Sequence, residues 1–240
     1  MKRFARILLS ALLPAVAIAP ASAAADLSAP KVTVRIERGD VDIDHSQNHR
    51  QIKSMMQCRR PATRGKYVGL STATFRSHFS STIAITPQGA GVTGGLVAAD
   101  VVLNIEKRTV YVASELPQGG CSFEQTRSHE LGHVRIDDEI ATLFAPRIAA
   151  AVKAAAKNLT NLQGRTPEDI TSAIQGTLNL VMEQQMRALQ ALRDSRQETL
   201  DSASEYSRLS KACHGETEAL VRAADEDEQG WYEDVGCPGP

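Results

Sequence analysis

The feature that most constrains this chain is the pentapeptide His129-Glu130-Leu131-Gly132-His133. Two histidines four residues apart project from the same face of an α-helix, so both imidazoles can bind one cation. The pattern therefore predicts a helix with a metal site, and zinc is the ion that such a pair favours. Glu130 follows the first histidine, where its carboxylate can accept a proton from a metal-activated water. We expect His129 and His133 to be zinc ligands and Glu130 to be the catalytic base.

The residues next to this pattern do not specify a third ligand. The metzincin pattern would continue with Gly at 136 and His at 139, but the chain has Ile136 and Glu139. Asp137 is on the same stripe as His133, yet it is about 12 Å along the helix axis from His129, too far to share a metal ion. We therefore expect Asp137 either to orient His133 or to be a solvated helix acid.

His214 is the best candidate for the third ligand among the other histidines. It stands between Cys213 and Gly215 at an expected helix end, where a disulfide can hold it rigid. The alternatives are carboxylates, namely Glu183 or Glu198.

The first half of the chain predicts β-strands. Apolar and polar residues alternate at 32–36 and 41–43, and residues 66–86 and 101–113 are rich in residue types that favour strands. Residues 87–95 contain four glycines and are expected to form a loop. We expect several antiparallel strands in this half.

The second half predicts long helices. Ser122 can cap a first helix, which Pro146 is expected to kink. Thr166-Pro167-Glu168-Asp169 is a second start signal, and the helical pattern after it runs to His214-Gly215. Residues 223–230 are acidic and are expected to be a solvated tail or cap.

Straight helices would keep His214 away from His133. If the two helical runs were straight and antiparallel, the level of His133 would be met again about 25 residues into the second run, with His214 about 30 Å beyond. We therefore expect a break in the second run, near Asp194-Ser195 or near Gly176.

The N-terminus has the pattern of a signal peptide. Lys2, Arg3 and Arg6 precede an apolar run at 7–19, and Ala21-Ser22-Ala23 supplies the small residues before a cleavage site. We expect cleavage after this tripeptide, no stable membrane span afterwards, and a secreted or periplasmic location. An uncleaved anchor is the alternative, although a bilayer span needs about 20 apolar residues.

Export to an oxidising compartment predicts two disulfides among Cys58, Cys121, Cys213 and Cys237. Three pairings are possible. A disulfide between Cys58 and Cys121 would cross-link one region of the chain, and a disulfide between Cys213 and Cys237 would cross-link another. Cysteine ligation of a metal is the weaker alternative, because no C-x-x-C spacing occurs.

Charge and composition exclude some classes of function. The formal net charge is -1, so no long-range field attracts nucleic acid. Aromatic residues make up only 4% of the chain, which argues against a ring-lined surface for sugars or bases. A length of 240 residues is enough for one globular domain or two small ones.

At these residues the chain resembles the bacterial secreted zinc-dependent proteases long catalogued as a domain of unknown function. The resemblance rests on His129-Glu130-Leu131-Gly132-His133 and on His214-Gly215, which ends another helix some eighty residues later. It implies a zinc site of His129, His133 and His214. Family members carry Tyr-Asp and Thr shortly before His-Gly, whereas here Tyr206 stands at a different spacing and no Thr follows it before His214. Tyr206 is the candidate to polarise a substrate carbonyl, or else a core-facing helix tyrosine.

The predicted fold class is α+β, with a small antiparallel β-rich N-terminal part followed by a long-helix zincin-like part. The expected regions are a signal peptide at 1–23, a β-rich region at 24–120, a helical region carrying the histidine motif at 121–215, and an acidic tail at 216–240.

Two functions agree with these features. The first is an exported zinc metallopeptidase that hydrolyses a peptide or protein substrate, whose backbone a strand such as 109–114 holds by edge pairing. The second is an envelope binding protein that keeps the zinc without turnover. A precursor that processes itself is a third possibility, and the sequence leaves the oligomeric state open.

Overall fold

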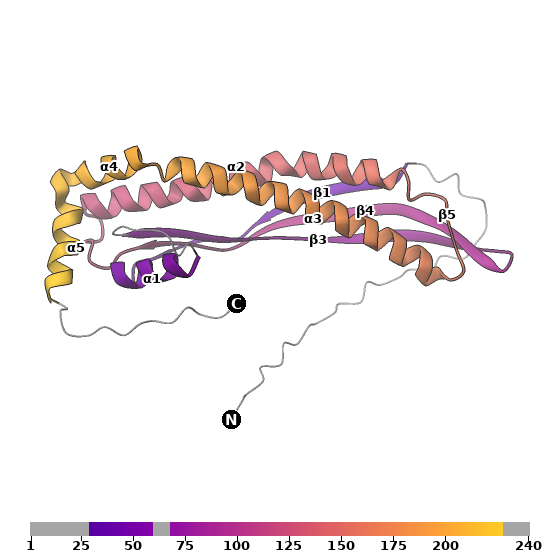
Figure 1. The fold of residues 1–240 in the computed structure, drawn as a ribbon, viewed down its shortest axis with the longest axis horizontal. Helices are drawn as coiled ribbons and strands as arrows, with labels where there is room; N and C mark the ends of the chain where they lie inside the picture. The colour runs from indigo at the N-terminus through magenta and orange to yellow at the C-terminus, as the bar shows by residue number, and fades with distance from the viewer. Residues whose placement is uncertain (1–28, 60–67, 228–240) are drawn as a thin grey trace, which may run out of the picture. The chain divides into compact units, whose positions relative to one another are not determined.

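The computed structural model describes residues 29–59 and 68–227 (Figure 1). The strands are β1 (Lys31–Arg38), β2 (Val41–Asp44), β3 (Gly69–Gln88), β4 (Gly91–Val112) and β5 (Leu162–Gly164). The helices are α1 (His49–Arg59), α2 (Cys121–Ala156), α3 (Pro167–Leu200), α4 (Ala203–Lys211), the short 3₁₀ helix η1 (Ala212–Gly215) and α5 (Glu216–Asp227). The predicted α+β class is confirmed.

The predicted signal peptide at 1–23 lies outside the described residues. No helix in the described part of the chain combines the length and the apolar character that a membrane span needs. The segment expected as an acidic tail from residue 216 is helical over α5, and residues 228–240 are not described.

Contacts divide the chain into two compact units. Unit 1 contains the described residues up to Thr33 together with 79–101 and 149–181, and unit 2 contains 34–78, 102–148 and the described residues from 182 onward. Neither unit is confined to the expected β-rich or helical region, because β3, β4, α2 and α3 contribute residues to both.

In unit 1, the prediction of a loop at residues 87–95 is wrong. β3 continues to Gln88 and β4 begins at Gly91, so only Gly89-Ala90 form the turn, with Gly89 at a φ of +59°. The other glycines permit close approach of backbones. A Cβ at Gly91 would lie 2.6 Å from the carbonyl oxygen of Gly164 in β5. These glycines therefore serve strand packing, which a loop signal does not reveal.

The start of α3, also in unit 1, is as predicted. The backbone N–H of Asp169 donates to the hydroxyl of Thr166 at 3.3 Å, and the Asp169 carboxylate accepts from the N–H groups of Arg165 and Thr166 at 2.8 and 3.0 Å. The apolar residues buried in this unit are Leu96, Ala99, Val101, Val152, Ala156, Leu159, Ile170, Ile174 and Leu178.

The sheet in unit 2 also contains a parallel pair, which the expectation of several antiparallel strands does not include. β2 pairs with β4 from Val41 opposite Arg108 to Asp44 opposite Tyr111. The pairing is parallel because α1 and β3 form a crossover connection between the two strands. Beside this sheet lies an apolar cluster of Ile52, Leu70, Val110, Val112, Ala113, Leu116, Phe123 and Val134.

The helices of unit 2 run antiparallel and place the histidine motif. The first part of α2 faces the last part of α3, where Asp137 pairs with Arg193 and His133 contacts Gln197. α3 is continuous to Leu200, so the breaks expected near Asp194-Ser195 or Gly176 are wrong. The chain breaks instead at residues 201–202, between α3 and α4. Pro146 lies inside α2, and a kink there stays a prediction.

A disulfide joins Cys121 to Cys213, so the suggested pairings of Cys58 with Cys121 and of Cys213 with Cys237 are wrong. Cys237 and the side chain of Cys58 lie outside what the structure describes. Ser122, expected as a helix cap, is instead buried in the first turn of α2 and donates to Glu216 at 2.8 Å. The start of α2 is thereby tied to η1 and to the start of α5.

The disulfide closes a loop with a sequence separation of 92 residues. We therefore expect a double Cys121→Ser, Cys213→Ser variant to lose about 2–5 kcal/mol of unfolding free energy, since the unfolded chain is no longer constrained. Urea denaturation followed by circular dichroism measures this. Ser207→Ala on the exposed side of α4 is the control, with a change within about 0.5 kcal/mol. Equal stability of the double variant and the wild type would contradict the prediction.

Candidate metal centre

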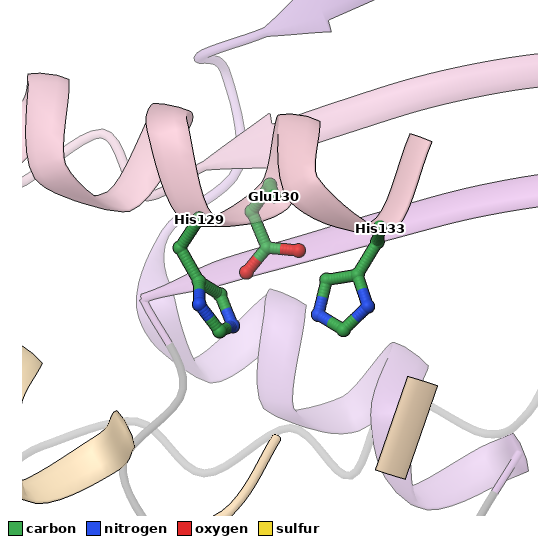
Figure 2. A group of neighbouring side chains, drawn as sticks. All are labelled: His129, Glu130 and His133. Carbon is green, nitrogen blue, oxygen red and sulfur yellow. The ribbon is translucent and has the colours of Figure 1, made fainter. Parts of the chain in front are cut away.

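One turn of α2 presents His129, Glu130 and His133 on the same side (Figure 2). All three residues are buried, and atoms of the three that can hold a metal lie within 4.8 Å of one another. Burial of a polar side chain is costly unless it is hydrogen-bonded, paired with a charge or bound to a metal. The predicted grouping of these residues is therefore present, and it could hold a metal ion.

Asp201, in the break after α3, reaches both imidazoles. Its Oδ1 atom lies 3.2 Å from Nε2 of His129 and 2.9 Å from Nε2 of His133. Burial by itself raises the pKa of Asp201, but the contacts with the two rings lower it well below its usual range. Burial likewise lowers the pKa of each histidine, but the contact with Asp201 and the negative charge of Glu130 together outweigh burial and raise both.

A polar relay orients His133. Its Nδ1 donates to Oε1 of Gln197, whose amide nitrogen donates to Asp137 at 2.8 Å and to the carbonyl of His133 at 3.2 Å. Arg193 in turn donates to both carboxylate oxygens of Asp137 at 2.6 and 3.0 Å. Asp137 was expected to orient His133 or to be solvated, and the structure buries it and connects it to His133 through Gln197.

Glu205 in α4 contacts the other histidine. Its Oε1 lies 3.4 Å from Nδ1 of His129. Arg208 donates to Glu205 at 2.6 and 2.8 Å, and this pair lowers the pKa of Glu205 to about 2. An ionised carboxylate only accepts hydrogen bonds, so Nδ1 of His129 is the donor. Both histidines therefore direct Nε2 toward Asp201.

Glu130 packs against the start of β3. Burial raises its pKa to about 7, despite the opposing influence of His133 and His129. A Cβ at Gly69 would lie only 2.5 Å from Oε1 of Glu130, so no larger residue fits there without moving this carboxylate. The chain thus brings a β3 backbone next to a carboxyl group that changes charge near neutral pH.

A cavity of about 710 Å³ opens beside these residues within unit 2. One wall carries His129, Glu130, His133 and Asp201. The apolar part of its lining comes from α1, from the residue before β3 and from β3, α4 and α5, as Met56, Val68, Leu70, Leu209 and Val221. The cavity size is in the range of small-molecule sites.

The structure separates the other predicted residues from the motif or brings them only near it. Tyr206 lines the cavity, 42% exposed, with its ring centroid 6.3 Å from that of His129. His214 is exposed in η1, with a φ of +56°, and is not part of the cavity lining. Glu183 and Glu198 are also exposed and outside the lining.

Sequence reasoning missed the residues that face the histidines, Gln197, Asp201 and Glu205. They follow one another at four-residue spacing, as do His129, His133 and Asp137. The matching periods on two antiparallel helical segments are a signal that the sequence contains. The expectation that the level of His133 recurs about 25 residues into the second helix already pointed near this segment.

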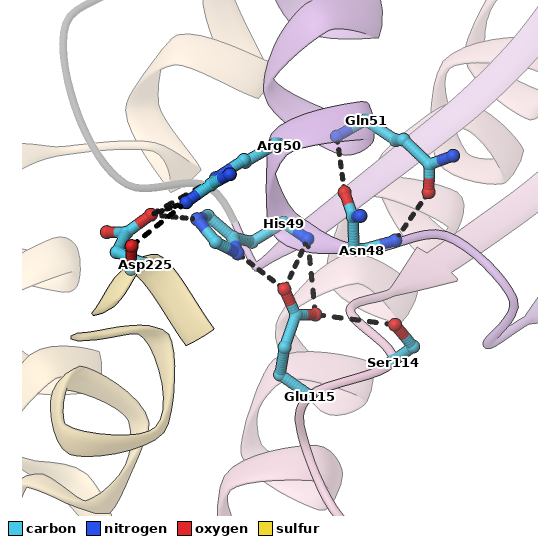
Figure 3. A network of polar contacts seen from close by, with 7 residues as sticks. All are labelled: Asn48, His49, Arg50, Gln51, Ser114, Glu115 and Asp225. Carbon is cyan, nitrogen blue, oxygen red and sulfur yellow. Dashed lines mark hydrogen bonds and ion pairs between the residues drawn. The ribbon is translucent and has the colours of Figure 1, made fainter. Parts of the chain in front are cut away.

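A second polar network holds α5, which forms part of the cavity wall (Figure 3). His49 is buried, with Nδ1 2.5 Å from Oε1 of Glu115 and Nε2 3.0 Å from Oδ1 of Asp225 in α5. The backbone N–H of His49 donates to both oxygens of Glu115, and Arg50 also pairs with Asp225. The start of α1, the segment before α2 and the end of α5 are thereby linked.

A scan of protein-family models and searches of curated proteins and of solved structures found no match to this chain. The resemblance to secreted zinc-dependent proteases therefore stays a prediction.

The His49 network predicts a pH-dependent contribution to stability. Burial raises the pKa of Glu115, but the hydrogen bonds from His49 outweigh it and lower the pKa below 4.5. A lowered carboxyl pKa stabilises the fold above the unfolded value and loses that effect as pH falls. Glu115→Gln should therefore cost about 1.5–3 kcal/mol near pH 7 and progressively less below pH 4.5.

Urea denaturation at a series of pH values measures this difference, with Glu139→Gln on the exposed side of α2 as the control. The control should show a small difference at every pH. A cost of Glu115→Gln that stays constant down to pH 3 would contradict the assigned role of this carboxylate.

Proposed function

We propose that this chain is an exported zinc metallopeptidase that hydrolyses peptide bonds with a metal-activated water. The observation that carries the proposal is the convergence of Nε2 of His129 and Nε2 of His133 on one oxygen of Asp201, at 3.2 and 2.9 Å. Nδ1 of each ring donates elsewhere, to Glu205 and to Gln197. Without a metal, Asp201 favours protonated rings that donate from Nε2, and a cation bound at this point would take the place of these protons.

The donor set fits zinc. Ligands at about 2.0–2.1 Å from a tetrahedral zinc ion lie about 3.3 Å from each other, close to the separations between Asp201 and the two rings. Imidazole nitrogen and carboxylate oxygen are both ordinary zinc donors. Nδ1 of His129 donates to Glu205 and Nδ1 of His133 donates to Gln197. Metal-binding histidines commonly donate their second ring N–H to such a partner, which fixes the orientation of the ring.

The proposed chemistry divides between the ion and Glu130. A zinc ion in such a site supplies a water of lowered pKa and polarises a carbonyl. Glu130 is placed to take the proton from the attacking water and return it to the leaving amine. Burial brings its pKa to about 7, where a carboxyl group can do both near neutral pH.

The substrate backbone is proposed to pair with β3 at residues 69–71. This segment lines the cavity beside Glu130, and within the described residues β4 is the strand that pairs with β3. At the other edge the backbone N–H of Ser71 donates to Glu130, and an extended peptide that pairs there would compete with this contact. The earlier candidate at 109–114 is wrong for this role, because β2 pairs with residues 108–111 and Ala113 donates to Val68 of the neighbouring segment.

Export is supported by two features. The disulfide between Cys121 and Cys213 is of the kind that persists in oxidising compartments. Residues 1–23 have the sequence pattern of a signal peptide.

Replacement of the base tests the proposal. Glu130→Gln should reduce hydrolysis of an unfolded, fluorescently labelled protein by at least about 100-fold, since proton transfer is lost. The zinc content measured by plasma mass spectrometry should stay at the wild-type value. Glu124→Gln, an exposed glutamate on the same helix, is the control and should leave both unchanged. A zinc-loaded wild type that cleaves neither unfolded proteins nor a broad peptide library would instead favour the binding-protein alternative.

Gly69→Ala should also lower turnover. The new Cβ would meet Oε1 of Glu130 at 2.5 Å, and displacement of the base by this contact should reduce kcat by about 10–100-fold with zinc retained. Gly176→Ala, where a Cβ meets nothing within 4 Å, is the matched control for a glycine replacement. Unchanged kcat in Gly69→Ala would contradict the assigned position of the base.

A further inference from the structure

We infer that Asp201 is the third protein ligand of the metal, in place of the predicted His214. The inference rests on the metal site of the proposed function and assigns a residue that completes it. Its first support is geometric, since one oxygen of Asp201 approaches the facing nitrogens of both His129 and His133 at ligand-like separations.

The position of His214 argues against a ligand role. Cys213 is bonded to Cys121 with a Cα–Cα distance of 5.7 Å, which fixes the neighbouring backbone at the first residue of α2. Cys121 precedes His129 by eight residues, or about 12 Å along the helix axis. The disulfide therefore holds His214 away from the histidine pair, with its side chain exposed.

The local fold explains why Asp201 can reach the site. α3 ends at Leu200, and the hydroxyl of Ser202 caps α4 by accepting from the backbone N–H of Glu205 at 3.3 Å. Asp201 thus lies in a short break between two helices. Gln197 before the break contacts His133, and Glu205 after the break contacts His129. The break is therefore held in place from both directions.

The charge and exposure of Asp201 suit a catalytic ligand. Two neutral imidazoles and one carboxylate partly neutralise a divalent cation, and three protein ligands leave one position for water or substrate. The Asp201 side chain is 21% exposed and lines the cavity, so an ion held by it would face the space that a substrate would enter.

Zinc affinity of the metal-stripped full-length mature protein tests the inference. Competition with a chromophoric chelator should give at least a 100-fold weaker affinity for Asp201→Asn, more than the loss of an orienting partner costs. His214→Ala should keep the wild-type affinity. Asp194→Asn is the matched control, because Asp194 lines the same cavity but pairs with Gln190 and not with either histidine.

Cobalt spectroscopy distinguishes ligation from a structural effect. Asp201→Cys loaded with Co²⁺ should gain a thiolate-to-metal charge-transfer band, which Asp194→Cys should lack. Circular dichroism checks that each variant is folded. A folded, cobalt-loaded Asp201→Cys protein without this band would overturn the inference, as would zinc loss in His214→Ala with wild-type affinity in Asp201→Asn. A wild type that takes up no zinc would refute the proposed metallopeptidase instead.

Discussion

The antiparallel contact between α2 and α3 in unit 2 determines the rest of the site. Each four-residue step along one helix meets a four-residue step in the opposite direction along the other, so Asp137 faces Arg193 and His133 faces Gln197. Arg193 neutralises a carboxylate that is almost completely buried, and loss of one partner of such a pair commonly costs about 3–5 kcal/mol. The same helix register brings Asp201 to the histidines.

The same helix register also determines which nitrogen of His129 and of His133 is used by a neighbouring side chain. Gln197 uses its amide nitrogen on Asp137 and on the His133 carbonyl, so its oxygen remains to accept from the ring. Glu205, kept ionised by Arg208, does the same for His129. The hydrogen-bonded partners outside the motif thus prepare both Nε2 atoms for a cation, which is the basis of the proposed zinc chemistry.

Local signals in the sequence were sufficient for the motif and for the start of α3. His129, Glu130 and His133 come from one helix turn, and Thr166 with Asp169 forms a cap within four residues. Asp201 could not be chosen because a polar residue every fourth position is common on a solvated helix face. The disulfide was ambiguous because four cysteines allow three pairings, and the parallel pairing of β2 depends on a crossover that no local pattern records.

The long sequence separations within the polar cluster affect when it can form. Gln197, Asp201 and Glu205 follow their histidine partners by 64, 72 and 76 residues. A nascent chain that has already formed the first turns of α2 still lacks all three. The cluster is therefore completed only after Glu205 has left the ribosome, so any reaction that needs it waits until both helical segments are outside.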